Sequence, residues 1–114
     1  MSVVITTRKF GTIYIIDFSG RLTVGLGATG LCQAVTEVAT AQGTDVILNL
    51  AEVEYMDSTG LQCLAVSKRT LDQIEGSLKL LNPSTAVTKL LQATYLSEAF
   101  PSFTDEESAI LSCT

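Results

Sequence analysis

The chain has 114 residues, of which 46% are hydrophobic and 17% charged, and this is enough apolar material for one core spanning residues 1–114 but not for two. The formal net charge of -5 repels phosphate backbones and anionic lipid surfaces, so it argues against nucleic acid and membranes as partners. The absence of histidine removes the commonest metal ligand and the commonest general base, so we expect no metal, no other cofactor and no hydrolase triad.

The start of the chain is predicted to form a β-hairpin. Residues 2–9 and 12–19 are rich in β-branched and aromatic side chains, which favour strands. Phe10 and Gly11 interrupt this run at the point where a tight connection between two strands would fall. We therefore expect two antiparallel strands here.

A glycine-rich loop and then a helix are predicted to follow the hairpin. Four glycines fall within a short span, which is too many for a regular helix, and they indicate an exposed, functional loop: Gly20, Gly25, Gly27 and Gly30. From about Ala28 to Gln42 the apolar residues recur at helical spacing, and Gly43 is a typical C-terminal stop.

The middle of the chain continues the alternation of strand and helix. Residues 45–50 form a β-favouring run that is apolar at neighbouring positions, as in a central strand covered on both faces. Apolar residues from Leu61 to Ile74 mark one face of a helix, which Gly76 ends. Residues 78–81 are predicted to form the next strand.

The last part of the chain is predicted to contribute two helices and an edge strand. Residues 82–84 are typical of a turn and helix cap, and they precede a helix that runs through Leu91. Residues 100–103 are too few for more than an edge strand. Acidic residues favour the start of a helix, so a final helix is expected from about Asp105 to Leu111.

This order of elements predicts the fold class. Alternating strands and helices after a hairpin give an α/β fold in which a mixed sheet of four to five strands packs against about four helices. In such sheets the functional groups gather where strands end and helices begin. That rule selects residues 50–61.

The cysteines and the N-terminus indicate a cytoplasmic protein. Cys32, Cys63 and Cys113 form an odd, widely spaced set without a CxxC pair, so we expect reduced thiols that act as small hydrophobes. Residues 1–10 lack a basic region followed by a long apolar stretch, and no apolar run approaches the roughly 20 residues that span a bilayer.

The segment Tyr55-Met56-Asp57-Ser58-Thr59-Gly60-Leu61 has two readings that are compatible with each other. Asp57 and Ser58 are both good N-caps, so one of them is expected to accept a hydrogen bond from the first turn of the helix. The Ser58 hydroxyl at this helix start is also suited to carry a phosphate, whose charge of about -1.5 to -2 meets the positive end of the helix dipole.

The same segment, extended back to Val53, resembles the signature of the STAS-domain anti-sigma factor antagonists, also called anti-anti-sigma factors. The resemblance covers nearly the whole chain. It continues, in order, at Gly20-Arg21-Leu22, Val46-Ile47-Leu48-Asn49-Leu50, Leu80-Leu81-Asn82-Pro83 and Phe100. It implies a STAS-like fold.

The resemblance also implies a bacterial partner-switching protein that is not an enzyme. In that cycle the unphosphorylated protein binds an anti-sigma factor that is also a serine kinase, and a sigma factor is released for transcription. Phosphorylation of Ser58 by this kinase breaks the complex, and a serine phosphatase restores it. Asp57 caps or orients Ser58, while Thr59 and Gly60 allow the kinase to approach. The partner-binding set is completed by Leu61, Leu22 and Thr23.

One departure from the family pattern keeps a second function open. Members of the family commonly carry an acidic residue where this chain has Thr23. An alternative is therefore a STAS scaffold subunit of a multi-protein or lipid-transport complex that does not switch, with Ser58 only a helix cap. Thr59, beside Ser58, is an alternative acceptor hydroxyl.

A third hypothesis, from a different class, is an enzyme or small-ligand binder. It would use Ser58 or Cys63 as nucleophile and the glycines of residues 25–30 to hold an anion. No basic neighbour precedes Lys68 to lower the pKa of Cys63, which argues against this hypothesis. Tyr55 and Met56 are predicted to be core residues, and Leu26 is left open between core and interface.

Overall fold

The computed structural model describes residues 3–41 and 44–113, which fold around a five-stranded sheet. The strands lie side by side in the order β1 (Val4–Phe10), β2 (Ile13–Leu22), β3 (Asp45–Met56), β4 (Ser77–Leu81) and β5 (Ser102–Phe103). The pair β1 and β2 is antiparallel, and all other neighbouring pairs are parallel. The predicted mixed sheet with an N-terminal hairpin is confirmed.

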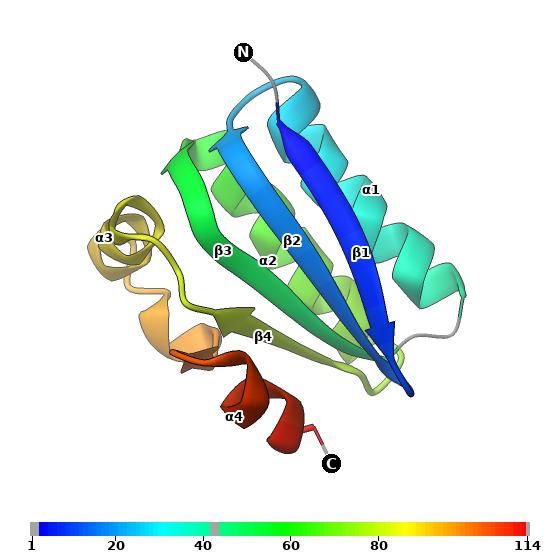
Figure 1. Ribbon diagram of the computed structural model, residues 1–114. Coiled ribbons are helices and arrows are strands. Elements are labelled where there is room, and N and C mark those ends of the chain that lie inside the picture. The colour runs from blue at the N-terminus through cyan, green and yellow to red at the C-terminus, as the bar shows by residue number, and fades with distance from the viewer. Residues whose placement is uncertain (1–2, 42–43, 114) are drawn as a thin grey trace.

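The helices lie on both faces of this sheet. They are α1 (Leu26–Thr40), α2 (Ser58–Asp72), α3 (Thr85–Ala93), the short 3-10 helix η1 (Ser97–Ala99) and α4 (Glu106–Leu111). Figure 1 shows α1 and α2 side by side behind the sheet, α3 beyond the β3 and β4 side, and α4 in front at the lower end. None of the helices in the described ranges combines the length and the hydrophobicity that a membrane span needs.

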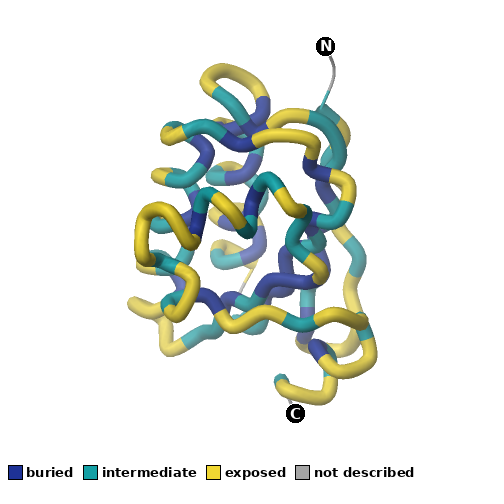
Figure 2. The backbone as a smooth tube through the Cα atoms, turned by 90° about the vertical axis from the view of Figure 1, so that its left-hand side faces the viewer, coloured by how far each residue is buried: buried dark blue, intermediate teal, exposed yellow. Residues whose placement is uncertain are grey.

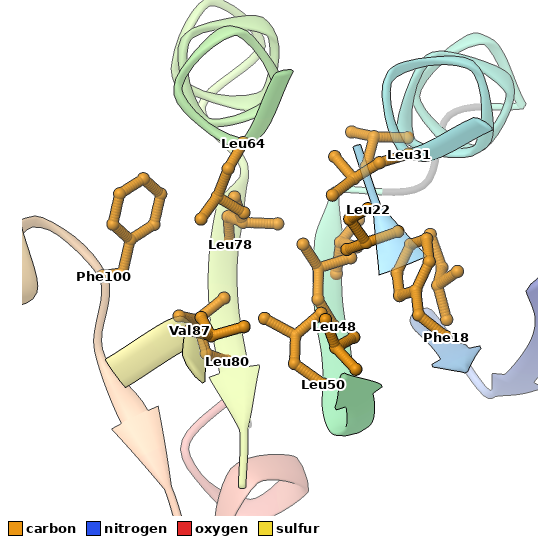
Figure 3. Close-up of a cluster of buried hydrophobic side chains, with 14 of the residues drawn as sticks. Phe18, Leu22, Leu31, Leu48, Leu50, Leu64, Leu78, Leu80, Val87 and Phe100 are labelled. Carbon is orange, nitrogen blue, oxygen red and sulfur yellow. The ribbon is translucent and has the colours of Figure 1, made fainter. Parts of the chain in front are cut away.

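The larger hydrophobic cluster lies between the sheet and the helices α1 and α2. In Figure 3, Leu31 from α1 and Leu64 from α2 point toward the leucines of the strands, among them Leu48. Val87 and Phe100 extend the cluster on the β4 side. Each fully buried side chain of this size contributes about 1.5–3 kcal/mol. In Figure 2 the buried segments lie in the interior of the molecule, and exposed turns surround them.

A smaller cluster on the opposite face of the sheet is covered by α4. Ile15 and Ile47 are fully buried there and pack with Ala109 of α4. The helix begins as the acidic run predicts, because the Asp105 side chain accepts a hydrogen bond from the backbone N–H of Ser108.

An ion-pair network links α4 to the hairpin. The Arg8 guanidinium donates to Asp17 at 2.6 Å and to Glu106 at 2.8 Å, and the Asn49 amide donates to Asp17 at 2.7 Å. Burial acts to raise the pKa of Asp17, but the hydrogen bonds from Arg8 and Asn49 outweigh it and hold this pKa below its usual range. Asp17 is therefore ionised at neutral pH and helps to fix α4.

The predicted start of the first helix is wrong, because α1 begins at Leu26 rather than about Ala28 and takes in two of the loop glycines, Gly27 and Gly30. A Cβ on Gly27 would collide with the backbone carbonyl of Arg21, so glycine lets α1 pack directly on the end of β2. The predicted stop at Gly43 lies outside the described residues. The N-terminal strand is confirmed from Val4 onward.

The central strand β3 is longer than the predicted 45–50, because it continues to Met56 along the extended end of β2. The pairing register between β2 and β3 shifts twice in this extension, between Asp17 and Ser19 and between Gly20 and Arg21. Such bulges change which side chains face inward. The extended ends of β2 and β3 reach the N-terminus of α2, where the predicted site lies.

Candidate functional site

The site lies where β2 and β3 end side by side and α1 and α2 begin, at the upper end of the sheet in Figure 1. Leu22 and Met56 are paired across the last positions of the two strands. The backbone N–H of Asp57 then donates to the Leu22 carbonyl at 3.4 Å. The topology thus brings the loop after β2 against the motif after β3, in agreement with the strand-end rule.

Asp57 ties this loop to the start of α2. One carboxylate oxygen accepts from the Gly60 backbone N–H at 3.0 Å, and the other accepts from the Val24 backbone N–H at 3.0 Å. These hydrogen bonds, that of Gly60 first, lower the pKa of Asp57 below its ordinary value. The predicted N-cap role of Asp57 is confirmed, and the structure adds its contact with the loop.

Gly60 allows the first turn of α2 to pack on the end of β2. It is buried, and a Cβ at this position would collide with the Leu22 carbonyl oxygen and lie 2.8 Å from Met56 Cγ. Gly60 was expected to give room to a kinase. The structure gives Gly60 a role in the protein's own packing, and the expected access for a kinase stays a prediction.

Ser58 is the first residue of α2 and is exposed. Within the described ranges its hydroxyl has no hydrogen-bond partner, and the first turn of α2 carries no acidic side chain. A phosphate on this hydroxyl would therefore meet free solvent and the positive end of the helix dipole. The neighbouring Thr59 is half-buried, so Ser58 is the more accessible of the two hydroxyls.

Large apolar side chains are exposed on the two segments that meet at this end of the sheet, the segment that follows β2 and the end of β3. Val24 is 74% exposed, Leu26 is 82% exposed and Tyr55 is 46% exposed. The Arg21 guanidinium lies over the Tyr55 ring, 5.0 Å from its centroid. We call Val24, Leu26, Tyr55 and Ser58 the docking face. Exposed apolar groups gathered beside a polar helix end are typical of protein interaction sites.

The structure shows how far each of the other predicted site residues is buried. Leu22 is fully buried, so the prediction that its side chain contacts a partner is wrong. Leu61 is half-buried and packs partly against the core. Thr23 is half-buried, and its carbonyl accepts from the Ala28 backbone N–H at 2.9 Å. Met56 is buried as predicted.

The core prediction for Tyr55 is wrong because the register shift near Gly20 breaks the strand alternation and turns this ring outward. Leu26, which the sequence leaves open between core and interface, is not a core residue, because it is largely exposed. Sequence reasoning missed Val24 and Arg21. An apolar residue between Thr23 and Gly25, in a segment already predicted to be an exposed loop, was the available signal for Val24.

The glycines of residues 25–30 do not form the anion loop of the third hypothesis. All but Gly25 of this segment lies inside α1, and Gly27 packs against the backbone of β2. A phosphate cradle needs free backbone N–H groups in a loop. The N–H groups of Ala28 and Thr29 already donate to Thr23 and Gly25 carbonyls, at 2.9 Å and 3.1 Å.

A family model described as "STAS domain" matches residues 4–109. The chain belongs to the STAS domain family. Among curated proteins none matches it. The fold is shared with solved structures of low sequence identity, so those structures bear on the fold of this STAS domain and not on its partners.

Three of these structures show how closely the fold agrees. A crystal structure from Thermotoga maritima has a TM-score of 0.88 at 17% identity and covers 96% of this chain and 93% of its own. An anti-sigma factor antagonist from Mycobacterium paratuberculosis has a TM-score of 0.84 at 21% identity, covering 98% and 94%. The Bacillus cell fate determinant SpoIIAA in its phosphorylated form has a TM-score of 0.75 at 22% identity, covering 96% and 99%. The predicted STAS-like fold is confirmed.

Proposed function

We propose that this STAS domain is an anti-sigma factor antagonist that is switched by phosphorylation of Ser58. The observation that carries the proposal is an exposed serine hydroxyl at the N-terminus of α2, which has no hydrogen-bond partner among the described residues and belongs to the apolar docking face. Structures named anti-sigma factor antagonists share the fold, and one of these proteins, SpoIIAA, also has a structure in its phosphorylated form. The domain acts in this proposal by binding and not by catalysis.

In the unphosphorylated state the docking face binds an anti-sigma factor that is also a serine kinase. The partner covers the exposed side chains of Val24, Leu26 and Tyr55, and removal of their apolar surface from water favours the complex. Arg21, which lies over Tyr55, adds a cation beside them. Aromatic and arginine side chains of this kind often dominate binding free energies. Binding the anti-sigma factor releases its sigma factor.

Phosphorylation of Ser58 adds a charge of about -1.5 to -2 to this face. The protein already carries a net charge of -5, and a contact surface that excludes water would have to bury the new charge. The phosphate therefore breaks the complex by local repulsion and desolvation, and helix α2 has no need to move. A serine phosphatase reverses the switch.

Because this chain has Thr23 where an acidic residue is common in the family, the base for phosphorylation of Ser58 has to come from the kinase. The carboxylate that the described structure places beside Ser58 is Asp57, and both of its oxygens already accept backbone N–H groups, from Gly60 and Val24. Asp57 therefore positions the helix start. The base that takes the Ser58 proton comes from the kinase in this proposal, since Thr23 supplies no carboxylate.

The test is a binding assay against the anti-sigma factor kinases of the source organism. We expect Ser58→Ala to bind constitutively and Ser58→Asp to lose binding by about tenfold or more. The matched control is Ser97→Asp, which adds the same charge at an exposed serine of η1. Equal binding by Ser58→Asp and wild type would refute the switch and favour the scaffold function.

A further inference from the structure

The two helices behind the sheet bring two cysteines together. Cys32 lies on α1 and Cys63 on α2, and the two helices pack side by side (Figure 1). The Cys32 sulfur lies 3.8 Å from the backbone carbonyl oxygen of Cys63. Both residues are half-buried, and both thiols are free. Residues 31 positions apart in sequence thus become neighbours across the helix contact.

The Cys32 side chain reaches the backbone of α2 at Cys63, so the two helices approach each other closely at this point. Ser67, one helical turn after Cys63, is 2% exposed, and its hydroxyl finds no hydrogen-bond partner in the described ranges. A disulfide requires Cα atoms about 4.4–6.8 Å apart, which only closely packed helices with small contact residues allow. The sequence analysis predicted reduced thiols that act as small hydrophobes, and it did not foresee that Cys32 and Cys63 are neighbours.

We propose that Cys32 and Cys63 form a redox-sensitive dithiol, which hydroperoxides oxidise to a disulfide between α1 and α2. The proposal concerns a modification site that lies outside the docking face. It does not depend on the phosphorylation of Ser58.

The two sulfurs have different roles in the reaction. The pKa of Cys32 is raised to about 12, mainly by burial and to a smaller extent by the neighbouring Cys63 thiol. Cys32 is therefore a protonated thiol at neutral pH. The thiolate is the form that attacks a peroxide. We therefore assign the first step to Cys63 and the second to Cys32.

In the first step the Cys63 thiolate attacks one oxygen of the hydroperoxide. The O–O bond breaks, an S–O bond forms, and the leaving alkoxide or hydroxide takes up a proton. In the second step the Cys32 sulfur attacks the sulfenic sulfur of Cys63. The S–S bond forms, the S–O bond breaks, and hydroxide leaves as water with the Cys32 proton. Two thiols lose two electrons and two protons, and one hydroperoxide is reduced to an alcohol (or water) and water.

The disulfide would fix the separation of the two helices whose N-termini carry the docking face. It would also close a loop between residues 31 positions apart, which restricts the unfolded chain. We expect the oxidised protein to unfold at a temperature higher by on the order of 10 °C. Dithiothreitol should reverse this shift.

The test is to treat the reduced protein with excess hydrogen peroxide, alkylate the remaining thiols in denaturant, and measure the mass of the intact chain and its peptides. We expect a monomer with one alkylated cysteine, Cys113, and a peptide pair joined through Cys32 and Cys63. The control Cys113→Ser should form the same bond, whereas Cys32→Ser and Cys63→Ser should form no intramolecular disulfide. Three alkylated thiols in the treated wild type, or a bond that includes Cys113, would overturn the proposal.

Discussion

The packing of α2 on β2 can be tested at Gly60. In Gly60→Ala the new methyl group meets the backbone carbonyl of Leu22, which cannot rotate away, and lies 2.8 Å from Met56 Cγ. Overpacking of this kind costs about 1–3 kcal/mol, and alanine recovers up to about 1 kcal/mol of it through its higher helix propensity. Because the main obstacle is backbone, we expect the upper part of this range. The free energy of unfolding should fall by about 2 kcal/mol.

Gly30→Ala is the matched control, since Gly30 also lies inside a helix. Its added methyl group meets Ile5 Cδ1 at 2.5 Å, which is the mobile end of a side chain. The free energy of unfolding should therefore stay unchanged or rise by up to about 1 kcal/mol. Urea denaturation followed by circular dichroism measures both variants under one condition. If Gly60→Ala were as stable as Gly30→Ala, the close contact between α2 and β2 would be wrong.

Three further predictions concern the ion-pair network and the docking face. Arg8→Met should lower the free energy of unfolding in urea by about 1 kcal/mol, because half-exposed ion pairs contribute little, and should make α4 more sensitive to proteolysis. Asp17 has a lowered pKa in the folded state, so its contribution is present above its unfolded pKa of about 3.9 and is lost as pH falls through the folded value. The stability difference between wild type and Asp17→Asn should be largest near neutral pH and shrink below about pH 4, and pH-dependent urea titrations that show a constant difference would contradict this. Tyr55→Ala and Leu26→Ser should each weaken partner binding by about tenfold in calorimetry while leaving thermal unfolding nearly unchanged, and a large loss of stability would mean that these side chains are structural.

The parts of the fold that depend on local signals could be predicted from the sequence. The Ser84 hydroxyl caps α3 at 3.4 Å from the Val87 backbone N–H, and Asp57 caps α2, as the residue types before each helix indicate. The strand-end rule placed the site in the segment where Ser58 is found. Both kinds of prediction need only residues that are neighbours in sequence.

The parts that depend on contacts between distant segments could not be predicted. Arg8 and Glu106 are 98 residues apart, and nothing local pairs them. Tyr55 turns outward because of a register shift between β2 and β3, and no residue pattern within β3 predicts this shift. Gly27 was assigned to a loop because its packing partner, the Arg21 carbonyl, becomes visible only once α1 is docked on β2.

The central claim is that Ser58 is a phosphorylation switch, and the most direct test is intact-mass spectrometry of the protein from its native cells with peptide mapping of residues 45–75. The account predicts a fraction of molecules with one added phosphate, located on the exposed hydroxyl of Ser58. A protein free of phosphate under every growth condition, or one that carries it on the half-buried Thr59, would contradict the account.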